Sequence, residues 1–527
     1  MTVEHRYVPA VSFDGGDLDC GNGLLLLIRK HIDPLDRGQL LQILSTEASV
    51  VEDLPSWCRL TGNDFVEMWS DDGPQRSFLV SKGPFVAPAP AAGTASSDAV
   101  PGSADAVPRS GPARRTDGRR QAPITQPIVA VTIPRVLPTP VTAPSVPERA
   151  VMGLGSWPRP RWLLRSLHEH LEGRISDDEF NETADDAVRL AVGAQLRAGV
   201  DVVSDGEQRR DNYSAFVGGL LDNCQLIPVT DLLPYVDDPE AFEQELAALD
   251  VPAGDIRHPA VFGPLGRSRP LAGLEAARLS ELTGKPRKVA LPGPYLLTRT
   301  MWMECISDRA YDDREELATD IVRVLREELH ALLADGVSVV QFDEPVLTEV
   351  VHGVVGEGGR TFMCGALGER GSTASELAFA RDLLQELLIG VPQERTALHL
   401  CRGNWTPDEA AALSGDYAPL VGLLSSIPVG SYLLEGCTPR AGELELLTAL
   451  PSDRRIGVGI IDQKHPDHHD KPAIAARMER AIGLFGTERV LFHPDCGFAT
   501  FADNPIIDSD TAEAVMATMV EVRDSLD

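Results

Sequence analysis

Eight short apolar runs alternate with longer amphipathic stretches between residues 151 and 497, and no other feature constrains the fold as strongly. The apolar runs are 151–156, 200–207, 288–294, 337–345, 396–401, 431–436, 455–462 and 489–497. The stretches between them are rich in Ala, Leu, Glu and Arg, and the clearest are 187–199, 316–336, 376–390 and 473–486. Strands that alternate with helices predict an α/β fold, here a (β/α)8 barrel of the TIM type. The alternative is an open doubly wound sheet, which is disfavoured because no glycine-rich phosphate turn follows the first run.

Two changes in composition divide the chain. Residues 83–147 consist mainly of Ala, Pro, Ser, Thr and Val without an amphipathic period, so we expect a linker that is extended and partly disordered. Residues 1–82 form a smaller unit, with an apolar helix at 23–32, a second helix at 53–60 and short strands at 38–46, 64–70 and 76–82. Asp53 is the expected N-cap of the second helix, with Pro55 in its first turn. We therefore expect a βαββ-like α/β sandwich at 1–82, the linker at 83–147 and the barrel at 148–527.

The chain carries a large excess of acidic residues. With 79 Asp and Glu against 48 Lys and Arg among 527 residues, its formal net charge is −31. A surface this acidic repels phosphate backbones and anionic headgroups, so the composition argues against nucleic-acid and membrane partners. No apolar run reaches the roughly 20 residues that span a bilayer, and the first residues lack the pattern of a secretory signal. Eight sparsely spaced cysteines are typical of free thiols or metal ligands in a reducing cytosol, so we expect a cytoplasmic protein.

Ionisable and sulfur-containing residues stand where the predicted barrel strands end, which is where functional residues gather in this fold. They are Ser156, Glu207, Asp343, His399, Cys401, Glu435, Asp462 and Cys496. His399 and Cys401 are two residues apart on a strand, so both side chains point to the same face. One histidine, two cysteines and Glu435 form a set of four ligands that suits zinc. Thiolates disfavour magnesium and calcium, and the mixed set differs from the all-thiolate ligation usual for iron–sulfur clusters.

Such a centre would activate a thiol of the substrate. A thiol that joins the zinc becomes a thiolate at neutral pH, and its sulfur is then a nucleophile for alkyl transfer. We expect Glu435, as the hardest and weakest ligand, to give up its place to the incoming sulfur. Two alternatives remain at this point, namely a closed structural zinc site and a His–Cys pair that simply packs in the core.

Seven motifs between residues 154 and 500 resemble the catalytic barrel of cobalamin-independent methionine synthases. They are LGSWPRP (154–160), SDGEQRRD (204–211), LPGPYLL (291–297), QFDEPVLTE (341–349), HLCRGN (399–404), LEGCTPRAGELELL (434–447) and HPDCGFAT (493–500). They occur in the family's order. The chain is similar to the shorter members that have a single catalytic barrel.

The resemblance implies roles for these residues. It implies that His399, Cys401, Glu435 and Cys496 are the zinc ligands. Ser156, with Leu154, matches the segment that holds the amino-acid substrate, and Glu207 and Asp343 match the carboxylates that bind its ammonium group. Buried acids are a reasonable partner for the amine of a zwitterion. The alternative for Glu207 and Asp343 is a salt bridge within the barrel.

The loop after the seventh strand departs from the family's pattern. The family places there an acid group that protonates the leaving group, and this chain offers Asp462, Lys464 and His465. Gapless matching puts Lys464 at the family's histidine position, whereas His465 keeps the family's type of group. We favour His465, because the ordinary pKa of an imidazole lies near neutrality. His465, His468 and His469 are alternatively a loop metal site or a solvated cluster.

The front unit resembles the TusA-like sulfur-carrier family. The matching segments are FDGGDLDC (13–20), GLLLLIRK (23–30) and DLPSWCRLTGN (53–63). That family carries persulfide sulfur on a cysteine at the start of its first helix, and Cys20 aligns with it. The helix N-terminus lowers the pKa of such a thiol. The family's Cys-Pro-x-Pro is replaced here by Cys-Gly-Asn-Gly.

Three functions follow, and we favour the first. It is zinc-dependent methyl transfer from methyltetrahydrofolate or a methylcorrinoid protein to a thiol amino acid, by default homocysteine, which yields methionine. The second is a sulfur relay, in which a partner protein loads Cys20 and the persulfide feeds C–S bond formation at the barrel zinc across the tether. The third is a non-enzymatic scaffold that binds zinc or traffics sulfur.

Overall fold

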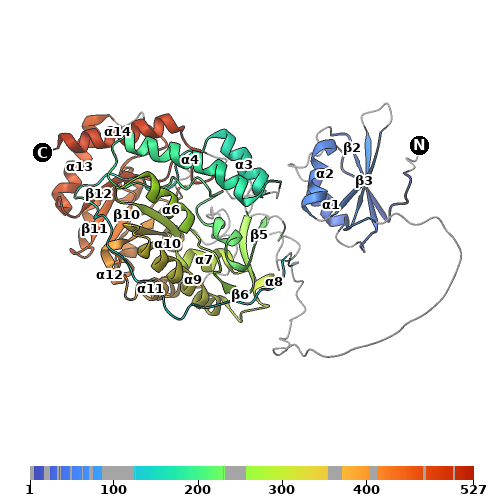
Figure 1. Cartoon of the computed structure of the whole chain (residues 1–527), viewed down its shortest axis with the longest axis horizontal. Helices are drawn as coiled ribbons and strands as arrows, with labels where there is room; N and C mark the ends of the chain where they lie inside the picture. Colours follow the sequence, from blue (N-terminus) through green and yellow to red (C-terminus); the bar gives the residue numbers. More distant parts are fainter. Residues whose placement is uncertain are drawn as a thin grey trace. The chain divides into compact units, whose positions relative to one another are not determined.

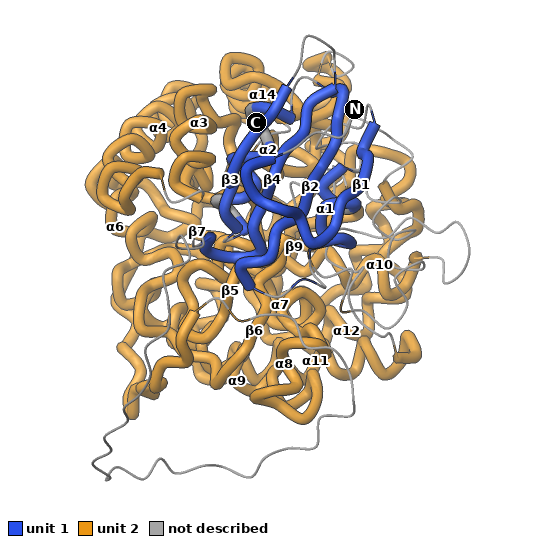
Figure 2. Tube along the Cα trace, turned by 90° about the vertical axis from the view of Figure 1, so that its right-hand side faces the viewer, with its two compact units in different colours: residues 1–113 blue, residues 114–527 orange. Residues whose placement is uncertain are grey.

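The computed structural model describes most of the chain as two compact units, residues 1–113 and 114–527 (Figure 2). The described residues are 5–16, 24–32, 35, 37–47, 50–61, 63–70, 75–85, 124, 126–171, 174–228, 231, 235, 257–353, 371–403, 412–466, 470–502 and 505–526. Cys20, His468 and His469 lie outside them. None of the helices in these described segments is long and apolar enough to cross a membrane.

The first unit is a four-stranded sheet with two helices (Figure 1). Its elements are β1 (Val11–Asp14), α1 (Leu25–Ile32), β2 (Leu40–Ser45), α2 (Val50–Leu60), β3 (Asp64–Ser70) and β4 (Arg76–Ser81). The strand order is β1-β2-β4-β3, with β1 parallel to β2 and the other pairs antiparallel. Ile28 of α1, Leu54 of α2 and Phe78 of β4 meet in one buried cluster.

This unit corrects two details of the prediction. The element order is βαβαββ rather than βαββ-like, because β1 is only four residues long and too short to show a period in the sequence. Helix α2 begins at Val50, so Asp53 is not its N-cap and Pro55 lies inside the helix rather than in its first turn. Helix α2 instead begins with Val50 and Val51, and valine is not a residue that signals an N-cap.

The second unit is built on a ring of parallel strands. β7 (Lys288–Pro292), β8 (Val339–Asp343), β9 (Thr396–Leu400), β10 (Ser431–Leu434), β11 (Arg455–Ile461) and β12 (Val490–Pro494) form a parallel sheet in sequential order. Parallel bridges join Val151 to Phe492, Met152 to Val202 and Val203 to Arg287. The segments around residues 151 and 202 therefore connect β12 to β7, and all eight predicted runs take part in a closed ring. This is the arrangement of a (β/α)8 barrel.

Helices surround this ring. They are α3 (Arg161–Leu171), α4 (Asp177–Arg197), α6 (Gly273–Leu282), α7 (Pro294–Met301), α8 (Glu304–Ser307), α9 (Arg314–Ala334), α10 (Val346–His352), α11 (Thr373–Leu388), α12 (Val421–Ser426), α13 (Lys471–Phe485) and α14 (Ser509–Ser525). Ser176, Asp313, Ser372 and Asp470 cap α4, α9, α11 and α13 by accepting a hydrogen bond from the third residue that follows. The helices α4 and α9 therefore begin earlier than the amphipathic stretches 187–199 and 316–336 from which they were predicted.

An antiparallel hairpin, β5 (Asp222–Pro228) and β6 (Arg257–Gly266), lies between the second barrel strand and α6. The sequence analysis did not anticipate it. β6 contains Pro259 and Pro264, and proline normally argues against a paired strand because it lacks a donor N–H. The hairpin belongs to the loops at the carboxyl ends of the barrel strands.

Part of the predicted linker is attached to the barrel. The carbonyl of Pro138 lies 3.1 Å from Nδ1 of His330, and the carbonyl of Val141 accepts a bond of 2.8 Å from Arg395. Arg455 donates to the carbonyl of Val146 at 3.0 Å. Residues 126–147 form neither helix nor strand, and they are bound along the barrel because their carbonyls accept hydrogen bonds from side chains that the sequence of the linker does not reveal.

Candidate metal centre

One pocket opens where the barrel strands end, and six of the predicted site residues line it. Its described lining consists of Gly155, Ser156, Glu207, Tyr213, Asp343, Pro345, His399, Cys401, Cys496, Gly497 and Thr500. Leu154, Glu435, Asp462, Lys464 and His465 are not among these described lining residues. Tyr213 and Thr500 were not predicted, because neither stands directly at the end of a strand.

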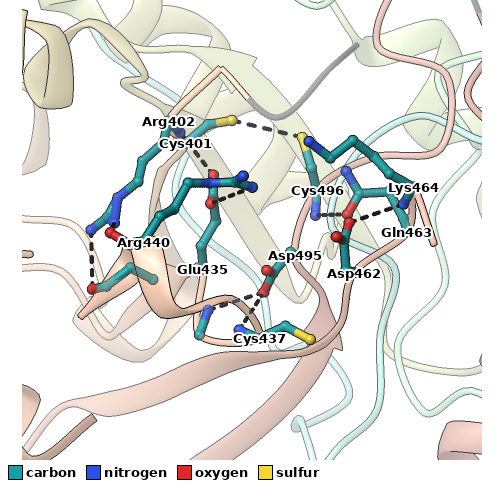
Figure 3. Close-up of polar contacts among 12 residues, drawn as sticks. Cys401, Arg402, Glu435, Cys437, Arg440, Asp462, Gln463, Lys464, Asp495 and Cys496 are labelled. Atoms are coloured by element: carbon teal, nitrogen blue, oxygen red, sulfur yellow. Dashed lines mark hydrogen bonds and ion pairs between the residues drawn. The ribbon is translucent and has the colours of Figure 1, made fainter. Parts of the chain in front are cut away.

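The sulfur atoms of Cys401 and Cys496 lie 3.7 Å apart in this pocket (Figure 3). Both residues are buried and neither forms a disulfide. Cys401 follows the last residue of β9, two positions after His399, so the alternation along the strand directs both side chains to the pocket. Cys496 follows β12, and its backbone N–H donates to the side-chain oxygen of Gln463 at 3.1 Å. Two residues far apart in the sequence thus present adjacent thiols.

His399 is held by Asp343 across the β8–β9 pair. The two residues are in register, and Nδ1 of His399 lies 2.7 Å from Oδ1 of Asp343. The other ring nitrogen, Nε2, is buried and has no hydrogen-bond partner among the described residues. A histidine that binds a metal commonly uses its second ring nitrogen for a carboxylate in this way.

Glu435 lies behind the pocket wall. Its Oε1 accepts a hydrogen bond of 2.8 Å from the backbone N–H of Arg402, and a guanidinium nitrogen of Arg440 is 3.8 Å from Oε2 (Figure 3). Oε2 is buried and accepts no hydrogen bond from the described residues. Three of the four predicted ligands therefore line the pocket. The fourth, Glu435, accepts a hydrogen bond from the backbone of Arg402, the residue that follows Cys401.

Asp495 organises the turn after Glu435. Its Oδ1 accepts hydrogen bonds of 3.0 Å from the backbone N–H groups of Gly436 and Cys437. Burial and the nearby charge of Glu435 together raise the pKa of Asp495 to about 7. A side chain at Gly459 would collide with this carboxylate, because a Cβ there would lie 1.8 Å from Oδ1. Asp495 was not predicted, although it directly precedes Cys496.

The donor atoms suit zinc. Within the described residues no group of three or more His, Cys, Asp or Glu side chains is already arranged to hold an ion. The sulfur separation of 3.7 Å nevertheless fits a shared tetrahedral zinc, since two Zn–S bonds of about 2.3 Å place their sulfurs about 3.8 Å apart. Nε2 of His399 and Oε2 of Glu435 are buried without hydrogen bonds to described residues, and they are the atoms that would supply the remaining nitrogen and oxygen.

A second group of pocket residues, which we call the carboxylate wall, consists of Glu207, Asp343 and Ser156, with the buried side chains of Arg159 and Arg210 nearby. Glu207 has a left-handed backbone (φ 54°), which its N–H bond to Asp205 and a bond of 2.8 Å from Arg159 to its carbonyl hold in place. Burial raises the pKa of Glu207, and the charge of Asp343 raises it further, while Arg210 opposes both effects. The Oγ of Ser156 is buried without a hydrogen bond to any described residue. This wall therefore offers an acid and a hydroxyl to a polar ligand.

The loop after β11 lies next to the thiols. Oδ1 of Asp462 accepts from the N–H of Lys464 at 3.0 Å, and the N–H of His465 donates to the carbonyl of Asp462 at 3.2 Å. Lys464 is buried, and in the view of Figure 3 its side chain points toward Cys496. His465, the candidate that we favour for the acid group, is not drawn in that view, so the choice between His465 and Lys464 stays a prediction.

The barrel is similar in sequence to known proteins. Residues 150–231 and 248–357 match the family model described as the catalytic domain of the cobalamin-independent synthase. A methionine synthase of Sulfolobus acidocaldarius is 24% identical over 348 residues, which cover 65% of this chain and 84% of that protein. A methionine synthase of Thermococcus kodakarensis is 24% identical over 344 residues, which cover 65% of this chain and 85% of that protein.

Two solved structures share the fold. A B12-independent methionine synthase from a Shewanella species, in complex with selenomethionine, aligns with a TM-score of 0.50 at 21% identity, covering 74% of this chain and 97% of that one. A vitamin-B12-independent methionine synthase from Listeria monocytogenes aligns with a TM-score of 0.51 at 18% identity, covering 73% and 99%. Both structures are less than 25% identical to this chain, so the likeness is one of fold. The resemblance of the front unit to sulfur carriers remains a prediction.

Proposed function

Because its barrel carries the catalytic domain of the cobalamin-independent synthase family, we propose that this protein transfers a methyl group to the thiol of homocysteine and forms methionine. The observation that carries the proposal is the pair of thiols 3.7 Å apart, with His399 beside them, in a pocket whose other wall bears Glu207 and Ser156. One wall suits a metal that binds sulfur, and the other suits the ammonium group of an amino acid.

His399, Cys401, Glu435 and Cys496 are the residues that would hold zinc. When bound there, zinc lowers the pKa of a thiol in the pocket and so supplies a thiolate nucleophile. Glu207 and Asp343 attract the ammonium group of the substrate, and the hydroxyl of Ser156 is available to its polar atoms. These contacts orient the homocysteine so that its sulfur lies on the side of the two cysteines.

The reaction exchanges one bond for another. A C–S bond forms to the homocysteine sulfur, the bond between the methyl group and its carrier breaks, and the carrier leaves with the electron pair of that bond. With methyltetrahydrofolate the leaving nitrogen takes up a proton, which Lys464 or His465 is placed to supply near Asp462. A methylcorrinoid protein is the other donor class, and its leaving group needs no proton.

The test is a methyl-transfer assay with isotopically labelled donor. The zinc-loaded full-length protein should form labelled methionine from homocysteine with methyltetrahydrofolate or with a methylcorrinoid, and the productive donor identifies the carrier class. X-ray absorption at the zinc edge should show an added sulfur when homocysteine is present. Zinc that gains no sulfur with any thiol, together with no transfer from either donor, would leave only the scaffold function.

The sulfur relay has its own test at Cys20, which lies outside the described residues. Under the methyl-transfer proposal, Cys20→Ser leaves methionine formation unchanged. Loss of product formation in that variant, with full zinc content, would favour the relay and make a sulfur-relay protein the partner of the front unit.

A further inference from the structure

A chain of hydrogen bonds inside the barrel connects Lys288, on β7, to His399, on β9. Nζ of Lys288 donates to Oε1 of Gln341 at 2.6 Å, and Nε2 of Gln341 donates to Oδ1 of Asp343 at 2.7 Å. The same Oδ1 lies 2.7 Å from Nδ1 of His399. The carbonyl of Leu154 accepts from both Lys288 (2.6 Å) and Gln341 (3.2 Å). All four linked side chains are buried.

Strand register brings these residues together. Lys288 is opposite Val339 on β8, so Gln341 lies two positions further along the same face, and Asp343 lies two positions beyond Gln341. Asp343 is itself opposite His399 on β9. The chain therefore runs along one inward-facing row of the barrel and ends at the pocket.

The chain has a direction, which is set at Lys288. An ammonium group has hydrogens to donate and no lone pair, so it requires the oxygen of the Gln341 amide. The amide nitrogen then faces Asp343, whose carboxylate can only accept. Because Oδ1 accepts from both neighbours, the Nδ1 of His399 must be the nitrogen that carries the proton. Nε2 of the neutral ring is then left with its lone pair.

We propose that Lys288 and Gln341 are positioning residues that fix the tautomer of His399, so that its Nε2 stays unprotonated and available to a metal ion. This inference rests on the proposed zinc site. Nε2 is buried without a hydrogen bond to any described residue, so the opposite tautomer would bury an unsatisfied N–H there and turn the lone pair of Nδ1 toward a carboxylate. Both consequences disfavour that tautomer.

The charges around Lys288 support the direction. Burial lowers the pKa of Lys288, and although the charges of Asp343 and Glu207 oppose this effect, the resulting pKa is about 8. Near pH 7 the side chain is therefore mostly an ammonium group, which can only donate. Asp343, which the family resemblance associates with substrate ammonium, has in addition the task of orienting His399.

Two substitutions test this chain of hydrogen bonds. Gln341→Glu keeps an acceptor for Lys288 but removes the N–H that binds Asp343, and Lys288→Met removes the donor at the start of the chain. Lys285→Met is the matched control, because Lys285 donates to backbone carbonyls of Gly199 and Val200 and takes no part in the chain. Zinc affinity of each full-length protein is measured by competition with a chromophoric chelator. Histidine tautomers are read from long-range ¹H–¹⁵N spectra of the zinc-free protein, with His399→Gln to assign the signal.

In the wild type we expect the proton of His399 on Nδ1, and in Gln341→Glu and Lys288→Met we expect a mixture of the two tautomers. Zinc should bind about 10- to 100-fold more weakly to both variants, which is the range for loss of a hydrogen-bond partner of a metal ligand. Lys285→Met should match the wild type. If Gln341→Glu binds zinc with wild-type affinity and keeps the tautomer of His399 unchanged, the proposed role of Lys288 and Gln341 is wrong. This variant decides the matter if Lys288→Met does not fold. A wild type that binds no zinc would instead refute the metal centre, while the spectra of the zinc-free protein still decide the tautomer.

Discussion

The two walls of the pocket hold their side chains in different ways. On the sulfur wall, His399 and Cys401 project from the end of β9 on one face, and Cys496 lies two residues after the end of β12. On the carboxylate wall, Glu207 lies in a left-handed turn that depends on Arg159. The regular geometry of strands positions the first wall, whereas hydrogen bonds between loops position the second.

The walls also differ in charge. The sulfur wall presents two thiols and a ring nitrogen, Nε2 of His399, which has no hydrogen-bond partner among the described residues. The carboxylate wall presents anions that buried cations balance only in part, and the pKa of Glu207 stays raised despite Arg210. The difference supports the proposal that one group of residues binds a metal and the other an ammonium group. A zwitterionic thiol is a ligand that uses both.

Removal of a thiol should have the largest effect. Cys496→Ser replaces a proposed zinc ligand with a poor one, so we expect the protein to lose zinc. Turnover should fall by more than roughly 100-fold, which is the upper range for removal of a residue that only hydrogen-bonds to a metal ligand. Metal analysis and the methyl-transfer assay measure this, and circular dichroism checks that the barrel is folded. Cys224→Ser is the control and should keep both zinc and activity, because Cys224 is buried in β5 and is not among the described residues that line the pocket. A fully active Cys496→Ser would remove the sulfur wall from the chemistry.

Neutralisation of the carboxylate wall should have the next largest effect. Glu207→Gln keeps the shape of the side chain but loses a charged hydrogen bond that contributes about 1.5–3 kcal/mol, so the KM for homocysteine should rise roughly 10- to 100-fold. Zinc content should stay at the wild-type level, which separates this wall from the other. Steady-state kinetics measure the effect. An unchanged KM accompanied by lost zinc would mean that the two walls act as one unit.

Glu435 belongs to neither wall, and its substitution tests whether a residue outside the pocket lining contributes to zinc binding. Glu435→Gln retains an oxygen for the N–H of Arg402 while it removes the anionic ligand. We expect zinc affinity to fall by about 10-fold, less than in Cys496→Ser, because a carboxylate is the weaker ligand in a thiolate-rich set. Chelator competition decides this. Affinity equal to that of the wild type would exclude Glu435 from the ligand set.

The pH dependence should show the smallest effect. Burial raises the pKa of Glu207 above its ordinary 4.5, and only the ionised carboxylate attracts the ammonium group. The value of kcat/KM should therefore fall as the pH drops through this raised pKa, so the acid limb lies above pH 4.5. In Glu207→Gln this limb should disappear from a profile of kcat/KM against pH. A limb that survives there belongs to another group.

The sequence predicted strand positions better than it predicted loops. All eight runs take part in the barrel, because a short apolar run between amphipathic stretches is a local signal. The β5–β6 hairpin was missed because Pro259 and Pro264 conceal a strand whose pairing depends on a distant partner. Lys288 could have been suspected from the sequence alone, since a lysine at the start of the apolar run 288–292 is unusual, but its partners could not.

The sequence by itself determined which chemical groups stand at the ends of the barrel strands, because the alternation of apolar runs is encoded over a few neighbouring residues. Only the tertiary structure decided which of these groups share a cavity. It brought Cys401 and Cys496 within 3.7 Å, directed Glu435 toward Arg402 and linked Lys288 to His399. Those outcomes depend on register and hydrogen bonds between strands far apart in the chain, and no local pattern carries that information.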